Sequence, residues 1–280
     1  MIISAFDLCR EAQLCKYDFT VENSGGDCWV RIRREGKSPF CSQWFSSSAE
    51  DRPLLVILPG YDAVFPSYPM DEVTEDFNVM LVSPLGYTER NAAVDPLKIK
   101  GEFPVLFNTV FDKPNAYDQW ILDVLTAIRW AREHTTANCE NLLFFGTSQG
   151  GGMSLVLSGI LSDKCKAVCA DEPWLIGFSS DMLETVISNA SYYFPNEILS
   201  YSGASERLAL TDPITYADKL TVPKLIMAGN KDTDCPADRI KRFFDTLPEP
   251  KDYFLFEERI HGHDIRAFRK AIEFFRKSFD

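Results

Sequence analysis

The stretch NLLFFGTSQGGGMSL, residues 141–155, decides how this chain folds and where its chemistry lies. An apolar run passes directly into glycines around one serine, Ser148, and a second apolar run follows. The first run predicts a buried strand and the second a helix, so Ser148 stands at a sharp strand-to-helix turn. Gly146 and Gly150, two residues before and two after the serine, leave room for the strained backbone of such a turn.

The pattern Gly-x-Ser-x-Gly between a strand and a helix is typical of a nucleophile elbow. The helix that begins after the serine points backbone N–H groups at the reacting atoms, where negative charge develops during acyl transfer. The alternative is an inert serine in a tight glycine turn, since the short pattern also arises by chance. The strand and helix on either side favour the first interpretation, so Ser148 is expected to be a nucleophile.

Around this stretch, apolar runs alternate with segments of helical periodicity. Strands are expected at residues 54–58, 77–82, 142–145, 167–170, 224–228 and 253–256, and helices at 117–133, 151–161, 181–189, 237–246 and 265–279. This alternation predicts an α/β fold with a mostly parallel central sheet, covered by helices on both faces.

The N-terminal part has a different pattern. Residues 17–21 and 28–33 alternate between apolar and polar side chains around a turn-forming segment, which predicts an antiparallel hairpin. We expect a single domain over residues 1–280, in which residues 1–50 add antiparallel strands to the same sheet. Residues 86–116 fit neither pattern and are expected to form a long excursion from the sheet, of the kind that usually serves function or contacts.

Charge and composition limit the classes of partner. The formal net charge of −12 opposes binding to nucleic acids and anionic membranes, and suits small neutral or cationic substrates. No apolar stretch approaches the roughly 18 residues of a membrane helix, and the N-terminus lacks the features of a signal peptide. A cytoplasmic location is therefore expected.

The eight cysteines form no Cys-x-x-Cys pair and have no histidine-rich neighbours, so neither a zinc site nor another metal site is predicted. Free thiols that behave as small apolar side chains are expected in a reducing compartment.

A serine becomes a strong nucleophile when a histidine takes its proton and a carboxylate orients that histidine. The chain has three histidines, and His134 lies before the serine, at the end of a predicted helix. The base is therefore expected in the segment HGHD, residues 261–264, between the last predicted strand and the last helix. His263 is the preferred choice because it follows the glycine and directly precedes the acid that opens the helix, and His261 remains the alternative.

The acid is expected after the strand at 224–228, because acids beyond the carboxyl end of a strand lie at the same sheet edge as the elbow. Asp232 and Asp234 both qualify, and the spacing from Gly229 and Pro236 favours Asp232. Asp234 is then expected to cap a helix or to lie solvated in the turn.

An oxyanion hole needs two backbone N–H donors, one after the serine and one after the first strand of the parallel sheet. Gln149 and Tyr61 occupy these two positions.

Several motifs together resemble one family, the acetyl xylan esterases and cephalosporin C deacetylases (carbohydrate esterase family 7) of the α/β-hydrolase fold. The segment GTSQGGG at 146–152 resembles the family's GxSQGGG elbow, and PGY at 59–61 resembles its oxyanion loop. Three further segments are similar to family motifs: KAVCADEPWL at 166–175, GNKDTDCP at 229–236 and GHD at 262–264. The likeness covers about residues 50–280.

The resemblance implies a serine esterase that removes small acyl groups, above all acetyl, from sugars or similar alcohols. It assigns Ser148 as nucleophile, Asp232 as acid and His263 as base, and the backbone amides of Tyr61 and Gln149 as the oxyanion hole. Trp174 is expected to line the pocket. The resemblance implies a small acylated molecule as substrate, no metal or other cofactor, and allows a homo-oligomer.

Two alternatives stay open. A peptidase or amidase can use the same fold and triad. A hydrolase-like domain without catalysis can serve as a binding protein.

Overall fold

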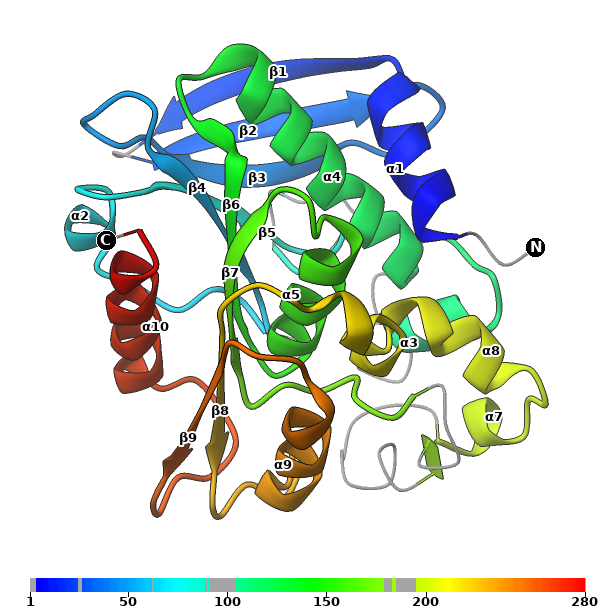
Figure 1. The fold of residues 1–280 in the computed structure, drawn as a ribbon. Coiled ribbons are helices and arrows are strands. Elements are labelled where there is room, and N and C mark those ends of the chain that lie inside the picture. Colours follow the sequence, from blue (N-terminus) through cyan, green and yellow to red (C-terminus); the bar gives the residue numbers. More distant parts are fainter. Residues whose placement is uncertain are drawn as a thin grey trace.

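The structure, a computed structural model, describes residues 4–24, 27–61, 63–88, 90, 104–178, 183–184 and 195–279 (Figure 1). Its central feature is one sheet, and its nine strands among these residues are β1 Tyr17–Ser24, β2 Asp27–Arg34, β3 Phe40–Phe45, β4 Pro53–Leu58, β5 Asn78–Val82, β6 Asn138–Thr147, β7 Cys165–Asp171, β8 Lys224–Gly229 and β9 Lys251–Phe256. They lie in the order β1-β2-β3-β5-β4-β6-β7-β8-β9. From β5 onward the neighbouring strands are parallel, while β1, β2 and β3 extend the same sheet with antiparallel pairs.

The predicted α/β fold, mostly parallel with an antiparallel N-terminal hairpin, is therefore confirmed. β1 and β2 pair in antiparallel register from Tyr17 opposite Arg34 to Ser24 opposite Asp27. All six predicted strands of the parallel part are present, with ends shifted by a few residues. The sequence interpretation missed β3 and the N-terminal helix α1, Ala5–Leu14, which begins with a capping box between Ser4 and Asp7.

Helices cover both faces of the sheet. Besides α1, the structure describes α2 Met70–Val73, α3 Val105–Val110, α4 Tyr117–His134, α5 Gln149–Ile160, α7 Pro195–Leu199, α8 Ala204–Leu208, α9 Ala237–Thr246 and α10 Ile265–Lys277, and the 3-10 segments Ala209–Thr211 and Pro213–Lys219. Four of the predicted helices correspond to α4, α5, α9 and α10. Of the predicted helix at 181–189 only residues 183–184 are described, and residues 89 and 91–103 of the excursion at 86–116 lie outside the described residues.

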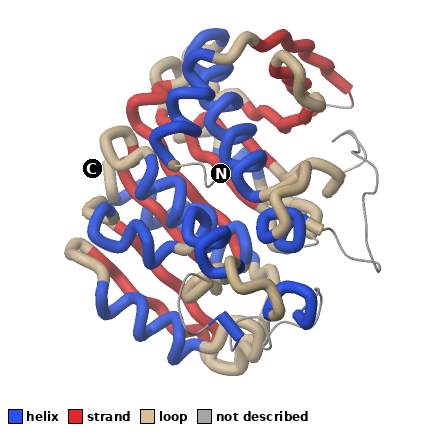
Figure 2. Tube along the Cα trace, turned by 90° about the vertical axis from the view of Figure 1, so that its right-hand side faces the viewer, coloured by secondary structure: helices blue, strands red, loops and turns tan. Residues whose placement is uncertain are grey.

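Two apolar clusters form the core, one on each face. Val56 of β4 packs in the larger cluster, with side chains of α1, α4, α5 and α9, whereas its neighbour Ile57 packs in the smaller one with α2 and α10. Adjacent residues point to opposite faces because side chains alternate along a strand. Figure 2, seen from the side of the larger cluster, shows helices in front of the strands.

The parallel strands fix where the site lies. β6, β7, β8 and β9 are successive neighbours in parallel pairs, so their carboxyl ends meet at one edge of the sheet. The segments that follow these four strands carry Ser148, Glu172, Asp232 and His261. Within the described ranges, no helix combines the length and apolar character needed to cross a bilayer.

Candidate active site

Ser148 lies on the turn between β6 and α5 with φ +57° and ψ −119°, a conformation that non-glycine residues rarely adopt. The glycines around it are required by close backbone contacts. A Cβ atom at Gly146 would lie 2.3 Å from the carbonyl carbon of Gly150, and a Cβ atom at Gly150 would lie 2.1 Å from the carbonyl oxygen of Leu58. The predicted elbow geometry is thus present.

Hydrogen bonds hold the strained serine in place. Its N–H donates to the carbonyl oxygen of Asp171 at 2.8 Å, and its own carbonyl oxygen accepts from the N–H groups of Gly152 at 3.0 Å and Trp174 at 2.9 Å. These bonds tie the turn to the end of β7 and to the first turn of α5. Because several hydrogen bonds hold the backbone of Ser148 at once, the strained conformation is kept in the folded protein.

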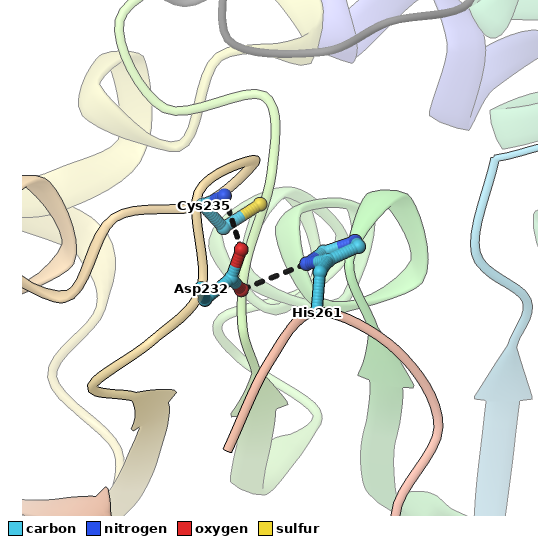
Figure 3. A group of neighbouring side chains, drawn as sticks. All are labelled: Asp232, Cys235 and His261. Atoms are coloured by element: carbon cyan, nitrogen blue, oxygen red, sulfur yellow. Dashed lines mark hydrogen bonds and ion pairs between the residues drawn. The ribbon is translucent and has the colours of Figure 1, made fainter. Parts of the chain in front are cut away.

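The serine hydroxyl contacts His261. Nε2 of His261 lies 2.9 Å from Oγ of Ser148, and Nδ1 lies 2.7 Å from Oδ2 of Asp232. The other carboxylate oxygen of Asp232 accepts backbone N–H groups from Asp234 at 2.9 Å and Cys235 at 2.8 Å. Figure 3 shows the Asp232 carboxylate between the Cys235 amide and the His261 ring. The preference for Asp232 over Asp234 agrees with this geometry, since Asp234 contacts the site through its backbone.

The preference for His263 does not agree with the structure, because His261 is the histidine that joins Ser148 to Asp232. His263 is exposed and lies at the rim of the same cavity, with its ring edge-on to Tyr68 at 5.5 Å between centroids. Neighbouring groups shield part of the ring from water, and this partial desolvation lowers the pKa of His263. His261, the alternative named from the sequence, is therefore the histidine in the position of the base.

The loop after β9 explains this outcome. Arg259 is buried and its guanidinium donates to both carboxylate oxygens of Asp171, at 2.6 and 2.8 Å, and to the carbonyl oxygen of Gly262 at 2.8 Å. These bonds anchor the loop at the sheet edge and leave His261 directly over the serine. Gly262 has φ +132°, so the chain turns there, and His263 belongs to the segment that leads into α10.

The electrostatic surroundings favour the charged imidazole. Burial disfavours the imidazolium, but the hydrogen bond that the ring donates to the Asp232 carboxylate favours it, so the pKa of His261 is raised. This is the form that arises when the ring accepts the serine proton. Burial raises the pKa of the nearby Cys235 thiol, so that group stays uncharged.

Asp232, Cys235 and His261 form the one group of three metal-ligating side chains found in the described ranges, with ligand atoms within 4.8 Å of one another. Figure 3 shows this group. Its acid and base are already hydrogen-bonded to each other, and the base is bonded to Ser148. The hydrogen bonds from Ser148 through His261 to Asp232 therefore explain why these side chains lie close together.

The expected oxyanion residues lie beside the serine. Gly60 and Tyr61 line the cavity at Ser148, and a Cβ atom at Gly60 would lie 3.7 Å from that of Ser148. Gln149 is the first residue of α5, and its buried side-chain oxygen accepts the hydroxyl of Tyr117 at 2.9 Å. Both predicted backbone donors are thus at the sheet edge where an oxyanion would form.

The cavity at Ser148 has a volume of about 170 Å³. Its lining includes Val64, Pro66 and Tyr68 from the loop after β4, together with His261 and His263 from the loop after β9. Trp174, which the sequence predicts in the pocket, does not line this cavity. It is 1% exposed and packs edge-on against Tyr61, with ring centroids 5.4 Å apart, so it supports the oxyanion loop from beneath.

Sequence reasoning gave no role to Asp171, Glu172 and Arg259, which surround the triad from below. The two acids directly follow the apolar part of β7, which is the same signal that pointed to Asp232. Arg259 carried no comparable signal, because its partner lies 88 residues away in the chain.

A parallel α/β sheet with a strained serine elbow and a serine–histidine–aspartate chain of hydrogen bonds defines the α/β class of serine hydrolases. The sequence comparison narrows this class. A model of the prolyl oligopeptidase family (Peptidase_S9) matches residues 113–280, more than half of the chain. The chain therefore belongs to the prolyl oligopeptidase family. No curated protein matches its sequence.

Solved structures share the fold at low sequence identity. Acetyl xylan esterase 1 from Thermoanaerobacterium sp. JW/SL YS485 is 14% identical with a TM-score of 0.76, covering 99% of this chain and 94% of its own. Acetyl xylan esterase from Paenibacillus sp. R4 is 18% identical with a TM-score of 0.72, covering 98% and 92%. Pyrococcus horikoshii acylaminoacyl peptidase is 18% identical with a TM-score of 0.62, covering 95% of this chain but 41% of its own. These similarities confirm the α/β-hydrolase fold.

Proposed function

We propose that this protein is a carboxylic-ester hydrolase that removes small acyl groups, above all acetyl, from sugars or similar alcohols. The observation that carries the proposal is the hydrogen-bonded chain from Ser148 through His261 to Asp232, at 2.9 and 2.7 Å. Both distances lie within the range over which a general base takes a proton from a nucleophile.

In this mechanism Oγ of Ser148 attacks the ester carbonyl carbon while Nε2 of His261 accepts the hydroxyl proton. Asp232 holds the ring in orientation and stabilises the imidazolium. The carbonyl oxygen gains negative charge and accepts hydrogen bonds from the backbone amides of Tyr61 and Gln149. The imidazolium then gives its proton to the leaving alcohol, and an acyl-enzyme remains. Water, deprotonated by His261, attacks the acyl carbonyl and releases the acid.

The cavity supports a small acyl group. Its volume of about 170 Å³ is below the roughly 300–1,000 Å³ of pockets that enclose drug-sized ligands. The formal net charge of −12 suits a neutral substrate, such as an acetylated sugar, better than an anionic one. The sequence resemblance to acetyl xylan esterases and cephalosporin C deacetylases supports the same substrate class.

A peptidase or amidase is the second candidate, and the match to the prolyl oligopeptidase family favours it. The chain corresponds to 41% of the acylaminoacyl peptidase that shares its fold. Esters and amides can be cleaved by the same triad, so the substrate must decide between the two candidates.

The test combines labelling with a substrate series. A fluorophosphonate should label wild-type protein at Ser148 and leave folded Ser148→Ala unlabelled; lack of labelling in the folded wild type would mean that the serine is not activated. p-Nitrophenyl esters of increasing chain length, acetylated xylo-oligosaccharides and an acetylated cephalosporin should then be compared with aminoacyl p-nitroanilides. Preference for acetyl esters supports the esterase. Preference for long chains excludes the small-acyl assignment, and faster anilide cleavage assigns a peptidase.

A further inference from the structure

A second carboxyl group faces the triad histidine from the strand next to that of Asp232. Glu172 directly follows β7, its side chain is 0% exposed, and its Oε2 lies 3.6 Å from Nδ1 of His261. Asp232 follows β8, the parallel neighbour of β7, and binds the same nitrogen at 2.7 Å. Two carboxyl groups from adjacent strand ends therefore converge on one imidazole nitrogen.

The surroundings of Glu172 form a built site for a carboxyl group. Oε2 accepts the backbone N–H of Gly262 at 3.1 Å, and Oε1 lies 3.2 Å from Nε of Arg259. A Cβ atom at Gly229 of β8 would lie 2.6 Å from the carbonyl oxygen of Arg259 and 2.7 Å from Oε1, so glycine at this position leaves room for both groups.

The backbone of Glu172 supports the same conclusion. Its φ is +44°, although it carries a long side chain, and its N–H donates to the carbonyl oxygen of Met227 at 2.9 Å. A strained backbone at a buried acid indicates that the position of its carboxyl group is fixed by the surrounding structure.

The buried charges below the triad are unbalanced. The carboxyl groups of Asp171 and Glu172 share one permanent cation, Arg259, whose bonds of 2.6 and 2.8 Å go to Asp171, while Asp232 interacts with the charge of the buried Arg239. Burial, together with the charges of Asp171 and Asp232, raises the pKa of Glu172 to about 8. Glu172 therefore holds a proton at neutral pH, and it ionises more readily when either neighbouring charge is removed.

We propose that Glu172 is a second positioning residue for His261, which orients the ring beside Asp232 and supplies the carboxylate at Nδ1 when Asp232 is lost. The inference rests on the esterase function proposed above. The titratable and charged groups around this carboxyl and the ring come from the ends of β7, β8 and β9 and the elements that follow them: Asp171, Asp232, Cys235, Arg239 of α9, Arg259, His261, His263 and Asp264.

Two consequences distinguish this role from one in which Glu172 only holds the loop through its hydrogen bond from the Gly262 N–H. In Asp232→Asn the negative charge of Asp232 is gone, so the pKa of Glu172 falls and Glu172 presents a carboxylate to Nδ1 at a lower pH than in wild type. In wild type the same ionisation occurs on the alkaline side, where it stabilises the imidazolium and should add a second rise to kcat/KM. A residue that only anchored Gly262 would produce neither effect, because a glutamine oxygen accepts the same N–H.

The experiment is a double-mutant cycle with wild type, Glu172→Gln, Asp232→Asn and the double variant, assayed on p-nitrophenyl acetate from pH 6 to 10. We expect Glu172→Gln to lower kcat at pH 7 by less than about threefold in wild type and by more than about tenfold in Asp232→Asn. The alkaline rise should be absent from Glu172→Gln. Asp234→Asn, in the neighbouring turn, serves as the matched control. In place of Asp232→Asn it should leave the effect of Glu172→Gln on kcat as small as in wild type.

A second measurement covers the case in which a variant fails to fold. In wild type with ¹⁵N-labelled histidine, the Nδ1 resonance of His261 should show two inflections, one for the ring and one for Glu172. The inference is overturned if Glu172→Gln lowers kcat by the same factor in wild type and in Asp232→Asn. It is also overturned if the Nδ1 resonance shows a single inflection. If wild type neither hydrolyses the ester nor takes up a fluorophosphonate, the proposed function itself fails.

Discussion

Replacing Arg259 with methionine tests the view that the buried ion pair between Arg259 and Asp171 stabilises the fold at the sheet edge that carries the site. Arg259 is 5% exposed and Asp171 is fully buried, and two hydrogen bonds of 2.6 and 2.8 Å join them. Methionine has a similar length but no charge, so the variant leaves a buried carboxylate without its cation. Breaking one side of a buried pair typically costs about 3–5 kcal/mol, and we expect a loss of that size in the free energy of unfolding at pH 7.

The pH dependence of the loss has a definite sign. Burial already raises the pKa of Asp171 above its ordinary value, and the Arg259 charge opposes that rise. Without Arg259 the folded-state pKa rises further. A carboxyl group with a raised folded-state pKa destabilises the fold as pH rises through the unfolded and then the folded value. The difference between variant and wild type should therefore be largest at neutral pH and shrink as the pH falls toward 5.

Urea denaturation of wild type and Arg259→Met at pH 7 and pH 5 measures this directly. Arg242→Met is the matched control, since Arg242 forms an exposed pair with Asp238 on α9 and should cost only about 0.3–0.5 kcal/mol. The reasoning is refuted if Arg259→Met loses no more stability than the control, or if its loss grows on acidification.

Two further predictions concern the acid and the elbow. Asp232→Asn should lower kcat on p-nitrophenyl acetate by about 10²–10⁴-fold, whereas Asp234→Asn should cost little because Asp234 contributes a backbone N–H; a larger effect at Asp234 would reassign the acid. Gly150→Ala should lower the free energy of unfolding by about 3 kcal/mol, since its Cβ would lie 2.1 Å from the Leu58 carbonyl oxygen. Gly60→Ala, with no contact shorter than 3.6 Å, should be nearly neutral when both variants are unfolded in urea, and equal losses would count against the packing argument.

The fold was predictable because local patterns and topology agree. Apolar runs ending in glycine or acids marked the parallel strands, and the elbow at 141–155 fixed how β6 joins α5. β3 was missed because FCSQWF shows no clear alternation, and the burial of four of its six residues depends on contacts that form only after folding.

The site was predictable where residues follow strands directly, as with Ser148 and Asp232. The histidine was not, because HGHD offers two rings and the sequence does not show which one faces the serine. The choice depends on Arg259, whose partner Asp171 lies on another strand, and on the turn at Gly262. Long-range ion pairs of this kind carry no local signal.

The central claim is that His261, not His263, is the base that activates Ser148. Comparing His261→Gln and His263→Gln on p-nitrophenyl acetate, with folding checked by circular dichroism, tests it most directly. We predict that His261→Gln lowers kcat by about 10³–10⁶-fold, because the ring at 2.9 Å from the serine oxygen is lost, while His263→Gln stays within about tenfold of wild type. A large loss in His263→Gln together with near-normal turnover in His261→Gln would contradict the account.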